Sequence, residues 1–200
     1  MRYVLGVDEA GRGPLAGPVA VGVIGAPADL DLLSAFPGLN DSKQLSKKKR
    51  EELFAILGGL QEKGIVRYSV TFGSHADIDR DGITRAVAEA AARGIRAIAP
   101  DPSDHKVFLD GLLHAPLEYE QETVIHGDAL IPAIMLASVA AKVTRDHLMI
   151  EMAGTYPGYG FEKHKGYGTA EHQAAIRKLG PCPVHRLTFL TRILSASMAA

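Results

Sequence analysis

Short apolar runs alternate along the chain with longer segments in which apolar residues recur at helical spacing. The short runs predict strands over residues 3–7, 19–24, 65–72, 106–109 and 117–124. The longer segments predict helices over residues 47–63, 83–93, 130–152, 169–179 and 186–197. Strands interspersed with helices indicate an α/β domain with a helical C-terminal part.

Boundary residues support the first and the longest of these helices. Ser46 is a typical N-cap for the first helix, and Gly64 stops it. Pro132 lies near the first turn of the longest helix, and Gly154 lies just past its expected end. Because 200 residues suit one domain, we expect a single domain over residues 1–200, with residues 155–200 as its helical C-terminal extension.

Charge is balanced over the whole chain but uneven at short range. Apolar residues make up 46% of the sequence, enough for a core, and the formal net charge is −1. This balance argues against a protein that coats nucleic acid, but it allows a local basic groove. Residues 47–50 and 163–165 are basic and residues 77–81 are rich in acids. Each run taken alone is typical of a solvated face.

The single cysteine and the N-terminal residues bear on location. Cys182 has no second cysteine to pair with, which fits a reducing compartment, and we expect it to be inert. The first residues lead directly into a strand, so no signal peptide is expected. The apolar stretch 129–143 is interrupted by polar residues and is too short to span a membrane. We therefore expect a cytoplasmic protein with no membrane association.

Acidic residues follow three of the predicted strands. Asp8 and Glu9 end the first strand beside a glycine-rich loop, Asp110 follows the run VFL, and Asp128 follows VIHG. Each has an ordinary alternative, since the Asp8–Glu9 pair suits a helix cap or a turn, Asp110 suits a turn and Asp128 suits a helix cap. The shared position favours a common site, because ligands of α/β sheets gather near strand ends.

Clustered carboxylates repel one another, and a divalent cation removes that repulsion. Oxygen ligands without matching histidine or cysteine ligands favour Mg²⁺ or Mn²⁺ over zinc. The glycine-rich loop lacks the lysine and the Ser/Thr of a P-loop, and its spacing does not fit a dinucleotide fingerprint, which argues against a nucleotide triphosphatase.

The longest predicted helix carries a polar stripe. Ser138, Lys142 and Arg145 are four and three residues apart, so they share one face of an otherwise apolar helix. Such a stripe favours a site for a polyanion, although lysine and arginine also extend to solvent from buried helices. Tyr167 is suited to stacking on a sugar or base and to bonding a 2′-OH.

Six blocks stand out over nearly the whole chain: GVDEAGRGPLAGPV, LNDSKQLSKKKRE, FLDG, ASVAAKVTRD, HKGYGTAEH and GPCPVHRLTF. Together and in this order, they resemble ribonuclease HII, the type 2 ribonuclease H. The resemblance implies a ribonuclease H-like fold, with a mixed central sheet flanked by helices and a helical C-terminal segment. It also implies endonucleolytic hydrolysis of RNA paired with DNA, including cleavage at a single ribonucleotide embedded in duplex DNA.

The resemblance assigns roles to individual positions. It implies that the catalytic, metal-binding acids are Asp8, Glu9, Asp110 and Asp128. It implies that substrate is bound by Gly11, Arg12, Gly13, Ser42, Lys43, Ser138, Lys142 and Tyr167. Within these, the Gly-Arg-Gly loop is expected to read the 2′-OH. The chain departs from the family at His126 and Leu130, where basic residues are common, and at Met135 and Leu136, where smaller ones are.

The favoured hypothesis is a nuclease with two Mg²⁺ or Mn²⁺ ions roughly 3.5 to 4 Å apart across the scissile phosphate, bridged by Asp8. It predicts cleavage on the 5′ side of the ribonucleotide, leaving 3′-OH and 5′-phosphate ends, by a monomer. The substrates would be RNA–DNA hybrids and DNA containing ribonucleotides. Two alternatives stay open: a module that binds hybrids without cutting them, and a nuclease directed at DNA.

Overall fold

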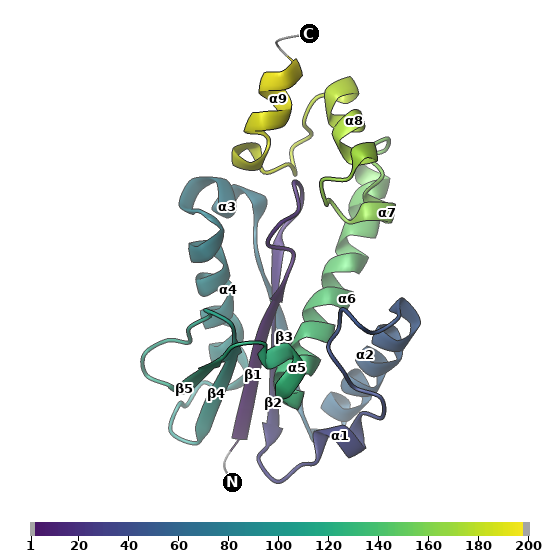
Figure 1. Cartoon of the computed structure of the whole chain (residues 1–200). Coiled ribbons are helices and arrows are strands. Elements are labelled where there is room, and N and C mark those ends of the chain that lie inside the picture. Colours follow the sequence, from purple (N-terminus) through teal and green to yellow (C-terminus); the bar gives the residue numbers. More distant parts are fainter. Residues whose placement is uncertain (1–2, 198–200) are drawn as a thin grey trace.

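Five strands form one mixed sheet in the computed structural model, which describes residues 3–197 (Figure 1). The strands are β1 (Tyr3–Ala10), β2 (Val19–Pro27), β3 (Arg67–Gly73), β4 (His105–Asp110) and β5 (Glu120–Val124). Their order is β3-β2-β1-β4-β5. β1 pairs antiparallel with β2 and parallel with β4, so the carboxyl ends of β1 and β4 meet at the same edge.

Helices cover both faces of this sheet. They are α1 (Leu32–Ala35), α2 (Lys47–Glu62), α3 (His75–Asp81), α4 (Ile83–Ile98), α5 (Gly127–Leu130), α6 (Pro132–Thr155), α7 (Phe161–His164), α8 (Ala170–Leu179), a 3-10 helix (Leu187–Phe189) and α9 (Thr191–Ser197). α4 packs on one face, and α6 with α2 packs on the other (Figure 1). The predicted α/β architecture with a helical C-terminal part is confirmed.

α6 lies directly on the backbone of β1 and β2. A Cβ atom added at Gly22 would lie 2.2 Å from the carbonyl oxygen of Ala137, and one at Gly6 would lie 2.2 Å from the carbonyl carbon of Ala133. Only glycine permits so close an approach. The next residue of α6 after Ala137 is Ser138, which the close packing brings to the side chain of Asp8.

A separate apolar cluster holds the C-terminal part against the rest of the molecule. It joins Met149 of α6 and Ala16 of the β1–β2 loop (residues 11–18) to residues that follow α6. Those later residues are Tyr159, Phe161, Cys182 and Val184. The β1–β2 loop is therefore packed against the C-terminal segment, far from it in sequence (Figure 1).

The predicted elements differ from the structure mainly at boundaries. The longest helix divides into α5 and α6, because Pro132 has no N–H and begins a new helix. α6 continues through Gly154, and the predicted helix 186–197 is a 3-10 turn followed by α9. The short helices α1, α3 and α7 were not predicted, since four to seven residues carry little periodicity.

Two sequence expectations concern the C-terminal residues and membrane association. Residues 198–200 of the expected C-terminal extension lie outside them. Among residues 3–197, no helix is both long and apolar enough to cross a membrane.

Candidate functional site

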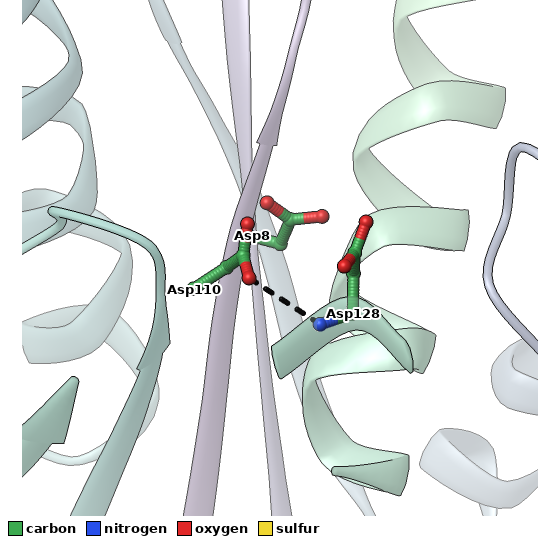
Figure 2. Close-up of side chains that lie close together, drawn as sticks. All are labelled: Asp8, Asp110 and Asp128. Carbon is green, nitrogen blue, oxygen red and sulfur yellow. Dashed lines mark hydrogen bonds between the residues drawn. The ribbon is translucent and has the colours of Figure 1, made fainter. Parts of the chain in front are cut away.

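Three aspartates from different elements meet at the carboxyl edge of β1 and β4. Asp8 lies near the end of β1, Asp110 ends β4, and Asp128 lies in α5 (Figure 2). One carboxylate oxygen from each lies within 4.8 Å of those of the other two. The backbone N–H of Asp128 donates to Oδ1 of Asp110 over 3.4 Å, which fixes α5 against β4. We call these three residues the acidic trio.

Burial and neighbouring acids make the trio a costly place for negative charge. Asp8 is 5% exposed. Its burial, followed by the charges of Glu9 and Asp110, raises its pKa from 3.8 to about 8, although a hydrogen bond with Ser138 opposes the rise. Without a cation, Asp8 therefore holds a proton at neutral pH.

Glu9 adjoins the trio but, among the described residues, is not one of the carboxylates whose oxygens lie within 4.8 Å of one another. β1 continues through both acids to Ala10, so the two neighbouring side chains leave opposite faces of the strand. The carboxylate of Glu9 instead accepts a hydrogen bond from Nη1 of Arg12 over 3.2 Å. Burial, with a smaller contribution from the charge of Asp110, raises the pKa of Glu9, while the charge of Arg12 opposes that rise. The sequence places four acids at one site, and the structure brings three of them into direct proximity.

The loop before α2 brings a lysine to the trio. Nζ of Lys43 lies 2.7 Å from Oδ2 of Asp128. The hydroxyls of Ser42 and Ser138 lie 2.7 Å apart, which joins this loop to α6. Nη1 of Arg50 donates to the carbonyl oxygens of Ser42 and Leu45 over 2.8 and 2.5 Å, so the base of the loop is also held by α2.

Most of the predicted substrate residues line one pocket of about 280 Å³ beside the trio. Its lining consists of Glu9, Ala10, Gly11, Ser42, Lys43, Arg50, Ser138, Lys142 and Tyr167. Arg12 and Gly13 are exposed next to it. A larger groove of about 740 Å³ lies between α3 and residues 181–187, and the trio does not line it. The chemistry of the side chains therefore favours the smaller pocket as the functional site.

The polar stripe of α6 divides between this pocket and the interior. Nζ of Lys142 lies 2.8 Å from Oδ1 of Asp146 and 6.0 Å from the ring centre of Tyr167, whose exposure is 42%. Arg145 is fully buried and donates to the carbonyl oxygens of Pro18, Ala16 and Lys165. The interpretation of Arg145 as part of a stripe facing a polyanion is therefore wrong, because three backbone carbonyls occupy its guanidinium.

The loop at Gly11 depends on the absence of a side chain. Gly11 has φ +94°, and a Cβ atom there would lie 2.1 Å from Nε of Arg145. Both the backbone conformation and the contact therefore require glycine. As a result, the backbone of the β1–β2 loop packs directly against the side chain of the buried Arg145.

The positions that depart from the family pattern flank Asp128. His126 is exposed and has φ 57°, and Leu130 is 65% exposed. Met135 and Leu136 are buried in α6. The positive charge that the structure brings to Asp128 comes from Lys43, in a different loop.

Sequence reasoning missed three residues that shape the site. Asp146 holds Lys142, and the spacing of four residues between them is a signal that identifies such a pair on a helix. Arg50 acts through backbone carbonyls of the loop just before α2, and Arg186 acts through those of the β1–β2 loop, far away in sequence. No sequence spacing indicates such contacts.

The fold is shared with a solved ribonuclease. The crystal structure of ribonuclease H2 from Pyrococcus horikoshii superimposes with a TM-score of 0.78 at 25% identity, over 99% of this chain and 100% of that one. The predicted ribonuclease H-like fold is thereby confirmed.

Curated relatives agree over nearly the whole length. Ribonuclease HII from Azorhizobium caulinodans is 48% identical over 94% of this chain and 69% of that protein. Ribonuclease HII from Geobacter metallireducens is 46% identical over 93% of this chain and 83% of that protein. A model of the family described as ribonuclease HII matches residues 5–193. The chain therefore belongs to the ribonuclease HII family, whose members are metal-dependent endonucleases.

Proposed function

We propose that this protein hydrolyses the RNA strand of RNA–DNA hybrids and nicks duplex DNA on the 5′ side of a single embedded ribonucleotide. The products carry 3′-OH and 5′-phosphate ends. The protein acts as a monomer with one catalytic domain, and residues 155–200 are the helical extension of that domain. Two divalent cations, Mg²⁺ or Mn²⁺, serve as cofactors.

One observation carries the proposal: three carboxylates from separate elements converge within 4.8 Å beside a pocket with basic residues on its wall. Structural aspartates in turns or caps have no reason to gather in this way, because their charges repel. The alternatives of a turn at Asp110 and a cap at Asp128 explain each residue alone but not their convergence.

The donor set fits a hard divalent cation. All three members of the trio offer oxygen, and no histidine or cysteine belongs to the group among the described residues. Oxygen-only sites suit Mg²⁺ and Mn²⁺, whereas zinc sites normally include nitrogen or sulfur. The raised pKa of Asp8 supports the same assignment, because a bound cation would offset the charge that burial disfavours.

The residues of the trio and of the pocket have separate proposed roles. Asp8, Asp110 and Asp128 hold the cations, with Glu9 adjacent to them. Divalent ions at this site supply Lewis-acid chemistry, which activates the attacking water and stabilises the charge of the leaving 3′-oxygen. Lys43 and Lys142, on the wall of the pocket, bind substrate phosphates, and Ser42 and Ser138 add hydroxyl donors.

Selection of RNA is assigned to the β1–β2 loop and Tyr167. Gly11, Arg12 and Gly13 bring backbone groups close to the ribose, and Tyr167 contacts the same sugar or its base. Polar groups arranged for a 2′-OH lose their partners when the sugar is deoxyribose, and this loss gives strong selectivity.

The direct test uses three end-labelled duplexes: DNA with one central ribonucleotide, the same DNA without it, and an RNA–DNA hybrid. We expect cleavage of the first and third in Mg²⁺ or Mn²⁺, and mapping of ends should place the nick on the 5′ side of the ribonucleotide. Binding without cleavage in either metal would indicate the hybrid-binding module. Equal cleavage of the all-DNA duplex would indicate a nuclease directed at DNA.

Removal of Lys43 is expected to tighten metal binding in the absence of substrate. Its ammonium lies 2.7 Å from Asp128, so it competes with a cation for the same carboxylate. The lysine side chain is 77% exposed, which limits the gain in affinity for Lys43→Gln to a few-fold, or about 1 kcal/mol. Calorimetric titration with Mn²⁺ measures it. Lys142→Gln is the matched control, since Lys142 pairs with Asp146 outside the trio. Weaker Mn²⁺ binding by Lys43→Gln would contradict the assignment.

A further inference from the structure

A buried arginine from the C-terminal segment reaches the back of the β1–β2 loop. Arg186 follows the block GPCPVH and is fully buried. Its Nη2 donates to the carbonyl oxygen of Gly11 and its Nη1 to that of Arg12, each over 2.7 Å. Its Nε donates to the carbonyl oxygen of Gly17 over 2.9 Å. A single guanidinium thus holds both ends of this loop.

These bonds decide which way two peptide groups face. The peptide bonds of the described residues are trans, so each N–H points opposite to the carbonyl of the same peptide group. Arg186 holds the carbonyls of Gly11 and Arg12 inward. The N–H groups of Arg12 and Gly13 therefore point away from the guanidinium, and within residues 3–197 neither has a hydrogen-bond partner.

The rest of the contact area makes Arg186 hard to displace. Its own N–H donates to the carbonyl of Leu15, and the N–H of Gly17 donates to the carbonyl of Val184, both over 2.8 Å. Burial and the nearby charge of Arg145 lower the pKa of Arg186 to about 9, so its guanidinium remains charged at neutral pH. Charged donors form the stronger hydrogen bonds, and the guanidinium that makes these three is fully buried.

We infer that Arg186 is a positioning residue for ribose recognition: it acts through the backbone of residues 11–13, turning two N–H donors toward the place where the 2′-OH would lie. The inference rests on the proposed function, because it concerns how the same site selects ribonucleotides. It makes the C-terminal segment part of the discrimination between RNA and DNA, although Arg186 itself would not touch the substrate.

A lysine at position 186 could not make the same three hydrogen bonds. A guanidinium directs several N–H groups in a fixed plane, whereas an ammonium is a point donor on a flexible chain. Arg186→Lys therefore keeps the charge but cannot hold the carbonyls of Gly11, Arg12 and Gly17 in the same geometry.

The experiment compares binding of two duplexes in Ca²⁺ by fluorescence anisotropy, one with a single ribonucleotide and one of the same sequence in DNA alone. The readout is the selectivity ratio, the dissociation constant of the all-DNA duplex divided by that of the ribonucleotide duplex. We expect Arg186→Lys to reduce this ratio about tenfold, the effect of removing one buried hydrogen bond to the ribose. Mn²⁺ binding to the trio, measured by calorimetry, should stay unchanged. A merely structural role would weaken binding of both duplexes equally and leave their ratio intact.

Two further variants keep the test decisive. Asp79 of α3 accepts hydrogen bonds from the N–H groups of Leu187 and Thr188, directly after Arg186, and lies at the surface. Asp79→Ala should loosen the segment that carries Arg186 and lower the ratio without removing the arginine. If Arg186→Lys does not fold, the ratio measured with Asp79→Ala tests the role of Arg186 instead. Arg93→Lys, which removes a guanidinium donating to the carbonyl of Phe72, is the control.

The possible results separate the two claims. If the wild-type protein bound both duplexes equally well, the proposed recognition of ribonucleotides would itself be contradicted. A wild-type preference that survives in both Arg186→Lys and Asp79→Ala would overturn the role of Arg186 alone. A reduced ratio in these variants, with Arg93→Lys at the wild-type value, supports it.

Discussion

Replacement of Asp8 by asparagine is expected to lower the rate of Mg²⁺-dependent cleavage by on the order of 10³-fold or more, because it removes a charged ligand worth several kcal/mol to the transition state. Asp8 contacts both neighbouring elements of the trio's surroundings. It lies next to Asp110 across the parallel pair of β1 and β4, and it also contacts Ser138 of α6. Loss of its charge would therefore weaken the proposed binding of cations at the trio, while asparagine keeps its size.

The measurement is kcat and KM on an end-labelled hybrid, repeated at rising Mg²⁺ concentration. Asp104→Asn is the matched control, since Asp104 immediately precedes β4 at its amino end and Asp110 ends the same strand. It should keep wild-type activity. If Asp8→Asn retained most of the turnover, Asp8 would have no essential part in metal binding.

The sequence predicted the acidic trio because the geometry of strands is regular. Asp8 and Asp110 each follow an apolar run, and parallel neighbours place their carboxyl ends together. Asp128 was found by the same pattern, although its segment begins a short helix rather than the long one. Glu9 was grouped with the others because a bend after the strand would bring it to the same site and because the family resemblance places an acid there. In the structure the strand continues through Glu9, whose carboxylate accepts a hydrogen bond from Arg12.

The other contacts of the site depend on packing between segments that are far apart in the sequence. The local spacing of apolar and polar residues does not indicate which segments pack together. Spacing on α6 correctly put Ser138 and Lys142 on one face, but it does not tell which neighbour covers the next turn. The carbonyls of the β1–β2 loop cover Arg145, so it is structural. In the same way, the pair of Lys43 with Asp128 joins residues 85 positions apart through the docking of a loop.

The second large effect expected is on stability, and it appears only without metal. In the unfolded chain, the carboxyl of Asp8 has its ordinary pKa of 3.8, whereas in the folded protein the pKa is about 8. Between about pH 4 and pH 8, the folded protein therefore keeps a proton that the unfolded chain has released. Unfolding releases this proton, so the free energy of unfolding should fall as pH rises, by up to about 1.4 kcal/mol per pH unit.

Asp8→Asn should abolish most of this slope, because asparagine resembles the protonated aspartic acid at every pH. In EDTA the variant should match the wild type near pH 4 and should be more stable by a few kcal/mol near pH 8. Urea denaturation across this range measures the difference. Mn²⁺ should stabilise the wild type increasingly as pH rises, because binding requires the ionised carboxylate, and it should have much less effect on the variant. A variant less stable than the wild type in EDTA at pH 8 would show that the three carboxyl groups do not repel one another, and the electrostatic basis for a cation site would then be lost.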